Sequence, residues 1–454
     1  MGVHISFLGG ADTVTGSKFL VQHQGISVMV DCGLFQGYKQ LRLRNRAPLP
    51  VDPSQISTVL LTHAHLDHSG YLPLLAKSGF RGPAYASSGT RDLCGILLPD
   101  SGHLQEEDAA FANRHGFSKH APALPLYTRQ DAIDCLPLIK TVPQRQAFSP
   151  LEGWRVTFQP AGHIVGASGI LVEVAGRRLF FSGDVGRPND ALMLPPDSLP
   201  AVDTLVVEST YGDRTHPTEN LVAELGPTLA RLAARGGKAV VPVFAVGRAQ
   251  AVLHAIAQLK AQGTIPRHLP VYLDSPMAVN TTQSFATHLG EYRLSREEVQ
   301  AMVHCATMVS TTDESKALAT RHGPTVILSA SGMATGGRVL HHLEQYAGDH
   351  RNMVILTGYQ APGTRGATLA SGAQSVRIHG HDVQVRAEVV QLESASAHAD
   401  AAQLIDWMRS CPKAPDQVYV VHGERAASDA LRIRIERELQ WRAMVPEQGS
   451  TWPC

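Results

Sequence analysis

Short apolar segments rich in β-branched residues recur along the chain, and each is followed by polar or turn-forming residues. They lie at residues 26–31, 58–62, 169–174, 179–182, 205–208 and 418–421. Runs of this length, bounded by turn residues, predict buried strands. Several of them end on, or just before, a histidine, an aspartate or a glutamate. Side chains suited to metal chemistry are therefore concentrated where the predicted strands stop.

The pattern changes between about residues 211 and 386, where apolar strands alternate with helical periodicity. The predicted pairs are Lys238–Val243 with Arg248–Gln262 and Val326–Ser329 with Thr335–Tyr346, and a strand follows at Met353–Gly358. Such alternation is typical of a parallel α/β domain. After residue 386 the pattern of the first part of the chain returns, with a strand at Glu388–Leu392 and a helix whose expected N-cap is Asp400. We predict a first domain made of residues 1–208 and 387–454, interrupted by an inserted domain of residues 209–386.

The composition narrows the class of protein. The 454 residues are 43% hydrophobic and 18% charged, which is globular usage, and 40 basic residues balance 40 acidic ones. Because the net charge is zero, the chain lacks an overall basic field, and any nucleic-acid binding must be local. The six scattered cysteines favour a reducing compartment, so we expect a cytoplasmic protein. No apolar run approaches the roughly 20 residues of a membrane span, so no membrane association is expected.

The most informative segment is Leu61–His68, at the point where an apolar strand gives way to a helix. His63 and His65 alternate on an extended stretch and should point the same way, while Asp67 and His68 begin the next turn and can face a second position. Histidine and carboxylate ligands without a thiolate favour zinc, or a similar ion, at an open catalytic site. The alternative is a set of surface histidines. Four potential ligands within six residues argue against that reading, which would suit a lone histidine.

Three more potential ligands lie at strand ends elsewhere in the chain. His163 and Asp184 each follow a glycine, and His422 precedes one. Glycine allows close approach of the backbone, as a crowded site requires. Asp31, which closes Val28–Asp31, is interpreted as an acceptor that orients a histidine and not as a ligand.

With these residues in place, the chain resembles the metallo-β-lactamase superfamily. Three segments, Glu208–Gly212, Ser396–Asp400 and His422–Glu424, are similar to the three further motifs of its β-CASP nucleases. The resemblance covers essentially the whole chain, and it implies an α/β fold with an αββα metallo-β-lactamase sandwich and an inserted parallel β-CASP domain. The family pattern implies one zinc ion on His63, His65 and His163, a second on Asp67, His68 and His422, and Asp184 between them.

The resemblance also implies a reaction. Two metal ions about 3.5 to 4 Å apart can activate water and stabilise charge on phosphate oxygens, but a ribose leaving group still needs a proton. The family pattern implies that His398, paired with Glu208, supplies it, and Asp67 is also assigned to the catalytic group. Without the motif, His398 would be read as a capping or core histidine beside the helix that follows Asp400.

Five residues are predicted to contact the substrate. Ser331, Gly332 and Arg338 lie in a glycine-rich segment that follows a strand and opens a predicted helix, and helix N-termini bind anions. Such a turn is by itself usually only a tight connection. In β-CASP enzymes a similar segment lines the cleft that faces the metals, and Arg365 and Ser396 belong to other segments that resemble the family.

The expected function is therefore zinc-dependent hydrolysis of single-stranded RNA to 5′-phosphate and 3′-hydroxyl ends, in a compact enzyme similar to RNase J and the mRNA 3′-end-processing nuclease. The alternatives are a β-CASP DNA nuclease or another hydrolase of the superfamily. His422 resembles the RNA-processing branch, because the DNA branch has a valine in that motif. The sequence leaves open whether cleavage is internal or from the 5′ end, and whether the chain forms a homodimer.

Overall fold

The computed structural model describes residues 2–116 and 120–454. The chain divides into two compact units, one formed by Met1–Thr215 with His398–Cys454 and the other by His216–Ala397. Among the described residues, no helix is both long enough and apolar enough to cross a membrane.

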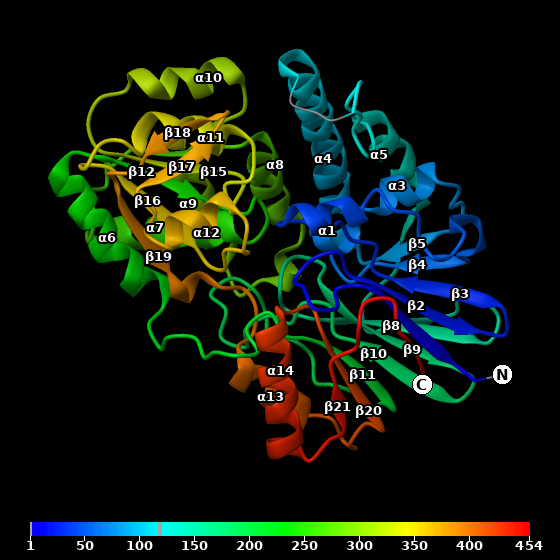
Figure 1. The fold of residues 1–454 in the computed structure, drawn as a ribbon. Helices are drawn as coiled ribbons and strands as arrows, with labels where there is room; N and C mark the ends of the chain where they lie inside the picture. Colours follow the sequence, from blue (N-terminus) through cyan, green and yellow to red (C-terminus); the bar gives the residue numbers. More distant parts are fainter. Residues whose placement is uncertain (1, 117–119) are drawn as a thin grey trace. The chain divides into compact units, whose positions relative to one another are not determined.

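The first unit contains two seven-stranded sheets (Figure 1). The first sheet has the order β22-β1-β2-β3-β4-β5-β6. Its strands are β1 (His4–Gly9), β2 (Lys18–His23), β3 (Ile26–Val30), β4 (Thr58–Leu60), β5 (Ala84–Ala86), β6 (Ile139–Thr141) and β22 (Thr451–Pro453). Strands β3 to β6 run parallel to one another. Residues that follow β3 and β4 therefore emerge at the same edge.

The second sheet has the order β21-β20-β11-β10-β9-β8-β7. Its strands are β7 (Ala147–Phe148), β8 (Trp154–Pro160), β9 (Ser168–Val174), β10 (Arg177–Phe181), β11 (Thr204–Glu208), β20 (Gln417–Val421) and β21 (Ala443–Met444). Strand β9 is antiparallel to both β8 and β10, and β10, β11 and β20 are parallel. Strands β8, β10, β11 and β20 thus point the same way, and their carboxyl ends meet at one edge.

One hydrophobic core lies between the two sheets. Phe7, Val21 and Val30 of the first sheet pack in the same buried cluster as Phe158 and Phe181 of the second. The other face of the second sheet packs against α13 (Ala401–Arg409) and α14 (Arg425–Arg434). On the first sheet, α4 (Ser88–His115) contacts β6 and α5 (Arg129–Cys135), which contacts α3 (Leu72–Lys77). The short helices α1 (Lys39–Arg44) and α2 (Leu66–Ser69) complete the unit. The predicted αββα sandwich is confirmed.

The second unit is built on a six-stranded parallel sheet of order β14-β13-β15-β12-β16-β19. The strands are β12 (Lys238–Pro242), β13 (Val271–Asp274), β14 (Thr307–Val309), β15 (Thr325–Ser329), β16 (Met353–Thr357) and β19 (Glu388–Leu392). The helices are α6 (Leu221–Arg235), α7 (Arg248–Gln262), α8 (Pro276–Ser284), α9 (Arg296–His304), α10 (Thr312–Ala317), α11 (Arg338–Tyr346) and α12 (Arg365–Ala370). A hairpin of β17 (Ser375–Ile378) and β18 (His381–Gln384) follows α12. The predicted inserted parallel α/β domain is confirmed.

Two local expectations differ from the structure. Strand β19 was expected to return to the first domain, but it pairs in parallel with β16 of the second unit. The helix expected from Thr335 begins at Arg338, because Gly337 adopts a positive φ of 78° and ends a loop. The predicted domain boundaries at residues 208 and 386 stay predictions.

Candidate metal centre

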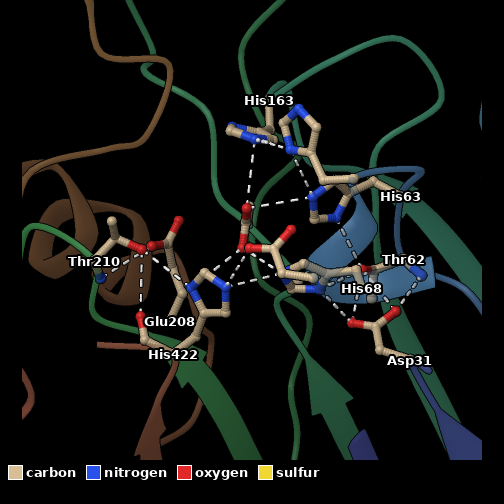
Figure 2. A network of polar contacts seen from close by, with 12 residues as sticks. Asp31, Thr62, His63, His68, His163, Glu208, Thr210 and His422 are labelled. Atoms are coloured by element: carbon tan, nitrogen blue, oxygen red, sulfur yellow. Dashed lines mark hydrogen bonds and ion pairs between the residues drawn. The ribbon is translucent and has the colours of Figure 1, made fainter. Parts of the chain in front are cut away.

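The candidate ligands lie where the topology brings strand ends together. His163 follows β8, Asp184 follows β10 and His422 follows β20, and these strands point the same way. His63 and His65 follow β4 of the first sheet. All of these residues lie in the first unit. The convergence is thus a consequence of strand direction, and it involves segments far apart in the sequence (Figure 2).

The first group consists of His63, His65, His163 and Asp184, whose ligand-type atoms lie within 4.8 Å of one another. Nδ1 of His65 is 3.2 Å from Nε2 of His63 and 3.3 Å from Nε2 of His163. Oδ2 of Asp184 is 3.3 Å from Nε2 of His63 and 3.4 Å from Nε2 of His163. Zinc–nitrogen bonds of about 2.05 Å in a tetrahedron separate the ligand atoms by about 3.3 Å. These four of the six separations match the spacing of a tetrahedral zinc site.

The second group consists of Asp67, His68 and His422. Nε2 of His68 is 3.0 Å from Nε2 of His422 and 3.2 Å from Oδ1 of Asp184. Oδ2 of Asp67 is 3.5 Å from Nε2 of His422. The two carboxylate oxygens of Asp184 therefore face different groups, Oδ2 the first and Oδ1 the second. This arrangement fits a carboxylate shared by two metal ions.

The electrostatics of the first group also suit a cation. Burial lowers the pKa of His63 and His163, and it lowers the pKa of His65 to about 3. These imidazoles are thus held neutral, which is the protonation state that binds metal. In the second group burial also acts to lower the pKa of His68, but the charges of Asp184 and Asp31 outweigh it and raise the pKa. Carboxylates that favour a proton on this ring favour a metal ion there for the same reason. The residues present fit zinc.

Residues behind the ligands fix the orientation of the rings. Oδ2 of Asp31 is 2.7 Å from Nδ1 of His68 (Figure 2). The hydroxyl of Thr62 donates to the same carboxylate at 2.9 Å and lies 3.1 Å from Nδ1 of His63. The hydroxyl of Thr210 is 3.1 Å from Nδ1 of His422. Each contact leaves the other ring nitrogen directed at the cluster, as partners of metal-binding histidines do. Sequence reasoning missed both threonines, although each lies within or beside a quoted motif.

Two of these positions have backbone conformations that are rare for residues other than glycine. Asp31 has a φ of 58° and His422 a φ of 49°. Non-glycine residues adopt this left-handed region infrequently, and strained backbone is concentrated at functional sites. Each of the two residues directly follows a strand, at the point where the chain turns and the residue's side chain points toward the cluster. The positive φ values therefore support a functional role for these two residues.

A histidine and a glutamate lie beside the ligand groups. Glu208, the last residue of β11, is fully buried and accepts hydrogen bonds from the backbone N–H groups of Val185 and Thr210. Its two oxygens lie 3.0 and 3.2 Å from Nδ1 of His398. Nε2 of His398 is 3.9 Å from Oδ2 of Asp184. Asp400 caps α13 with its own side chain. His398 is thus placed to exchange a proton beside the metal cluster through Nε2.

The five residues predicted to contact the substrate lie in the second unit. The guanidinium of Arg338 donates to Oδ1 of Asp274 at 2.8 Å and to the carbonyl of Ser310 at 2.7 Å. The guanidinium of Arg365 donates to the carbonyls of Arg377 and Thr335. Both guanidinium groups therefore make structural contacts within their own unit, which weakens the prediction that they bind phosphate.

The other three predicted substrate residues are Ser331, Gly332 and Ser396. The Ser331 hydroxyl accepts from the backbone N–H of Thr335 at 2.9 Å, and Ser396 is 3% exposed. A Cβ at Gly332 would lie 2.6 Å from the ring of Phe244, so this loop packs closely. Ser331 and Gly332 thus belong to a folded loop and not to the first turn of α11, and the burial of Ser396 argues against direct contact with RNA.

Two comparisons with known proteins agree with this site, and a third bears on the fold. The metallo-beta-lactamase superfamily matches residues 12–225, the Beta-Casp domain residues 249–369, and the Zn-dependent metallo-hydrolase RNA specificity domain residues 382–446. Ribonuclease TTHA0252 of Thermus thermophilus is 36% identical over 92% of this chain and 92% of its own length. An RNase J-like protein of Methanocaldococcus jannaschii is 30% identical over 99% and 100%. A crystal structure of a protein of unknown function from Enterococcus faecalis covers both chains completely with a TM-score of 0.54 at 15% identity, which shows similarity of fold alone.

Proposed function

The chain belongs to the β-CASP family of the metallo-β-lactamase superfamily, and from this and the geometry of its site we propose that it is a two-zinc ribonuclease. It would hydrolyse single-stranded RNA and leave 5′-phosphate and 3′-hydroxyl ends. The observation that carries the proposal is the meeting of two ligand groups at Asp184, with His398 and Glu208 beside them.

The metal assignment follows the two groups. His63, His65 and His163 would hold one zinc ion, Asp67, His68 and His422 the other, and Asp184 would serve both through its two oxygens. When bound, the two ions lower the pKa of water and stabilise negative charge on a phosphodiester. The count of two ions is part of the proposal, since the zinc-dependent family and the cluster support metal binding as such.

The remaining residues have roles in positioning and proton transfer. Asp31, Thr62 and Thr210 would fix the rings of the ligand histidines through the contacts described above. The Glu208 carboxylate accepts the Nδ1 proton of His398, which leaves Nε2 directed at the cluster. A protonated His398 in this place can donate to the departing ribose oxygen as a general acid. Asp67 would take part in catalysis as a ligand of the second ion.

RNA is the proposed substrate for two reasons. The family described as a Zn-dependent metallo-hydrolase RNA specificity domain matches residues 382–446. Two relatives that span most of the chain are named as a ribonuclease and an RNase J-like protein. DNA and non-nucleic-acid substrates remain the alternatives. The reducing cytoplasm is the proposed location, and the six cysteines, all free, are compatible with it. A homodimer stays a prediction that light scattering would test.

The proposal can be tested with a pair of end-labelled oligonucleotides of the same sequence, one of RNA and one of DNA. The zinc-loaded chain should cut the RNA and produce ends that a 5′-phosphate-dependent exonuclease accepts. The Asp184→Ala variant should lose this activity. Cleavage of the DNA alone, or hydrolysis of neither strand under conditions where two zinc ions are bound, would contradict the proposal.

A further inference from the structure

A second group of metal-ligand side chains lies in the second unit, apart from the centre described above. It consists of His341 and Glu344 on α11 and His379 in the turn between β17 and β18, and one ligand-type atom from each lies within 4.8 Å of the others. Residues three positions apart on a helix share one face. His341 and Glu344 are therefore presented together, and His379 approaches from a different element.

The turn of the hairpin explains how His379 reaches the helix. Ile378 pairs with His381, so the turn contains only His379 and Gly380. Their φ values are 46° and 90°, which is the sign required at both central positions of a type I′ turn. His379 is held with its Nδ1 3.0 Å from Oε2 of Glu344 and its ring centroid 4.6 Å from that of His341.

The two elements that carry the group are packed together beneath it. Val376, Ile378 and Val383 of the hairpin belong to the same buried cluster as Leu340 and Leu343 of α11. These leucines precede His341 and Glu344 by one residue each. The separation between helix and hairpin is therefore set by the core, so the group is preorganised and binding of an ion would need little rearrangement.

The chemistry of the group suits a borderline divalent cation. Two imidazoles and a carboxylate, without thiolate, are ligands that zinc accepts. The other oxygen of Glu344 lies 2.8 Å from Nε2 of His381.

We propose that His341, Glu344 and His379 form a separate zinc-type cation site that ties the β17–β18 hairpin to α11. The site is distinct from the centre in the first unit, since its three ligands come from the second unit alone. The competing explanation is an ion-paired contact in which Glu344 holds His379 and His381 without a metal. Zinc uptake distinguishes the two.

The test uses the untagged full chain, stripped of metal, reloaded with two equivalents of Zn²⁺ to fill the first centre, and then titrated with further Zn²⁺ by calorimetry. The variants are His341→Ala, which keeps a good helix former, and His379→Asn, which tolerates a positive φ. His350→Ala is the matched control, because His350 lies in the same unit with its side chain 84% exposed. The wild type and the control should share a binding event of about one equivalent that raises the melting temperature. Each ligand variant should bind that equivalent at least about tenfold more weakly.

Equal zinc uptake by all four proteins would overturn the proposal. A wild type that takes up no additional equivalent would overturn it as well, and lower melting temperatures of the variants in that case would identify the metal-free ion pair. RNA hydrolysis is not the readout, so the result is independent of the proposed ribonuclease activity. Since none of the three residues belongs to the first centre, their variants should also cleave RNA at the wild-type rate.

Discussion

Replacement of His398 separates proton donation from metal chemistry. The ring is held by Glu208 at 3.0 Å through Nδ1, and Nε2 lies 3.9 Å from Asp184, so His398→Ala removes a proton donor and leaves the seven proposed ligands in place. Loss of a general acid lowers the rate by about 100- to 10,000-fold, which corresponds to about 3 to 5.5 kcal/mol in the barrier. This loss should occur on RNA, whose ribose leaving group needs a proton.

A nitrophenyl phosphodiester offers the contrasting substrate, because its leaving group departs without protonation. On this ester the His398→Ala variant should lose less than about tenfold. Glu208→Gln should show the same selectivity, since a neutral amide no longer balances the charge of the ring. His103→Ala is the control: His103 is exposed and forms an ion pair with Glu107 at 3.6 Å.

The assay measures kcat/KM on both substrates together with zinc content and melting temperature. Equal losses on RNA and on the nitrophenyl ester, with zinc retained, would refute the assignment of His398 as the acid. A loss of zinc or of stability in step with activity would instead assign it a structural role.

Three further predictions follow from other parts of the structure. Asp31→Asn should weaken zinc binding by about 10- to 100-fold, measured by competition with a chelator, because it alters the contact that orients His68; unchanged affinity would exclude that role. Burial lowers the pKa of Lys18 to about 8, below the unfolded value near 10.5, so the unfolded chain binds more protons at this residue, and the contribution of Lys18 to stability, taken as the difference from Lys18→Met, should rise by about 1 kcal/mol between pH 7.5 and 9. Denaturant unfolding of the two proteins should show this difference, and an equal change with pH in both would count against it. Affinity for single-stranded RNA should fall only modestly with salt, since the net charge is zero; a slope that implies about ten or more neutralised phosphates would argue for an extended basic surface.

Helices and strands were predicted correctly from the sequence where the hydrophobic periodicity agreed with the residues that begin or end such an element. Helix α7 has the predicted bounds, Arg248–Gln262, and Asp400 caps α13 with the side chain of Gln403 as its partner. The partner of a strand is harder to infer. The apolar run at Glu388–Leu392 was located correctly, but nothing in a single strand says which sheet it will join. The start of α11 was missed because glycine-rich segments permit several loop conformations.

The candidate site was predictable to the extent that its residues form local motifs. The close spacing of four ligand-type residues is recognisable in the sequence, at His63, His65, Asp67 and His68. The threonines that orient the rings have no such signal. Thr62 and Thr210 act through contacts to His63 and His422 that only the fold creates. The contact of Arg338 with Asp274 could not be predicted either, because the two residues are 64 positions apart in the sequence and only the fold brings them within hydrogen-bond distance.

The central claim is that the first unit holds two zinc ions which share Asp184. The most direct measurement is anomalous scattering at the zinc edge from crystals of the zinc-loaded chain, with cleavage of RNA measured on the same preparation. We predict two peaks in the first unit, one at about 2.0 to 2.2 Å from the ligand atoms of His63, His65 and His163, the other equally close to those of Asp67, His68 and His422. Asp184 should contact both. A single peak there, or none, in a preparation that cleaves RNA at full rate would contradict the account.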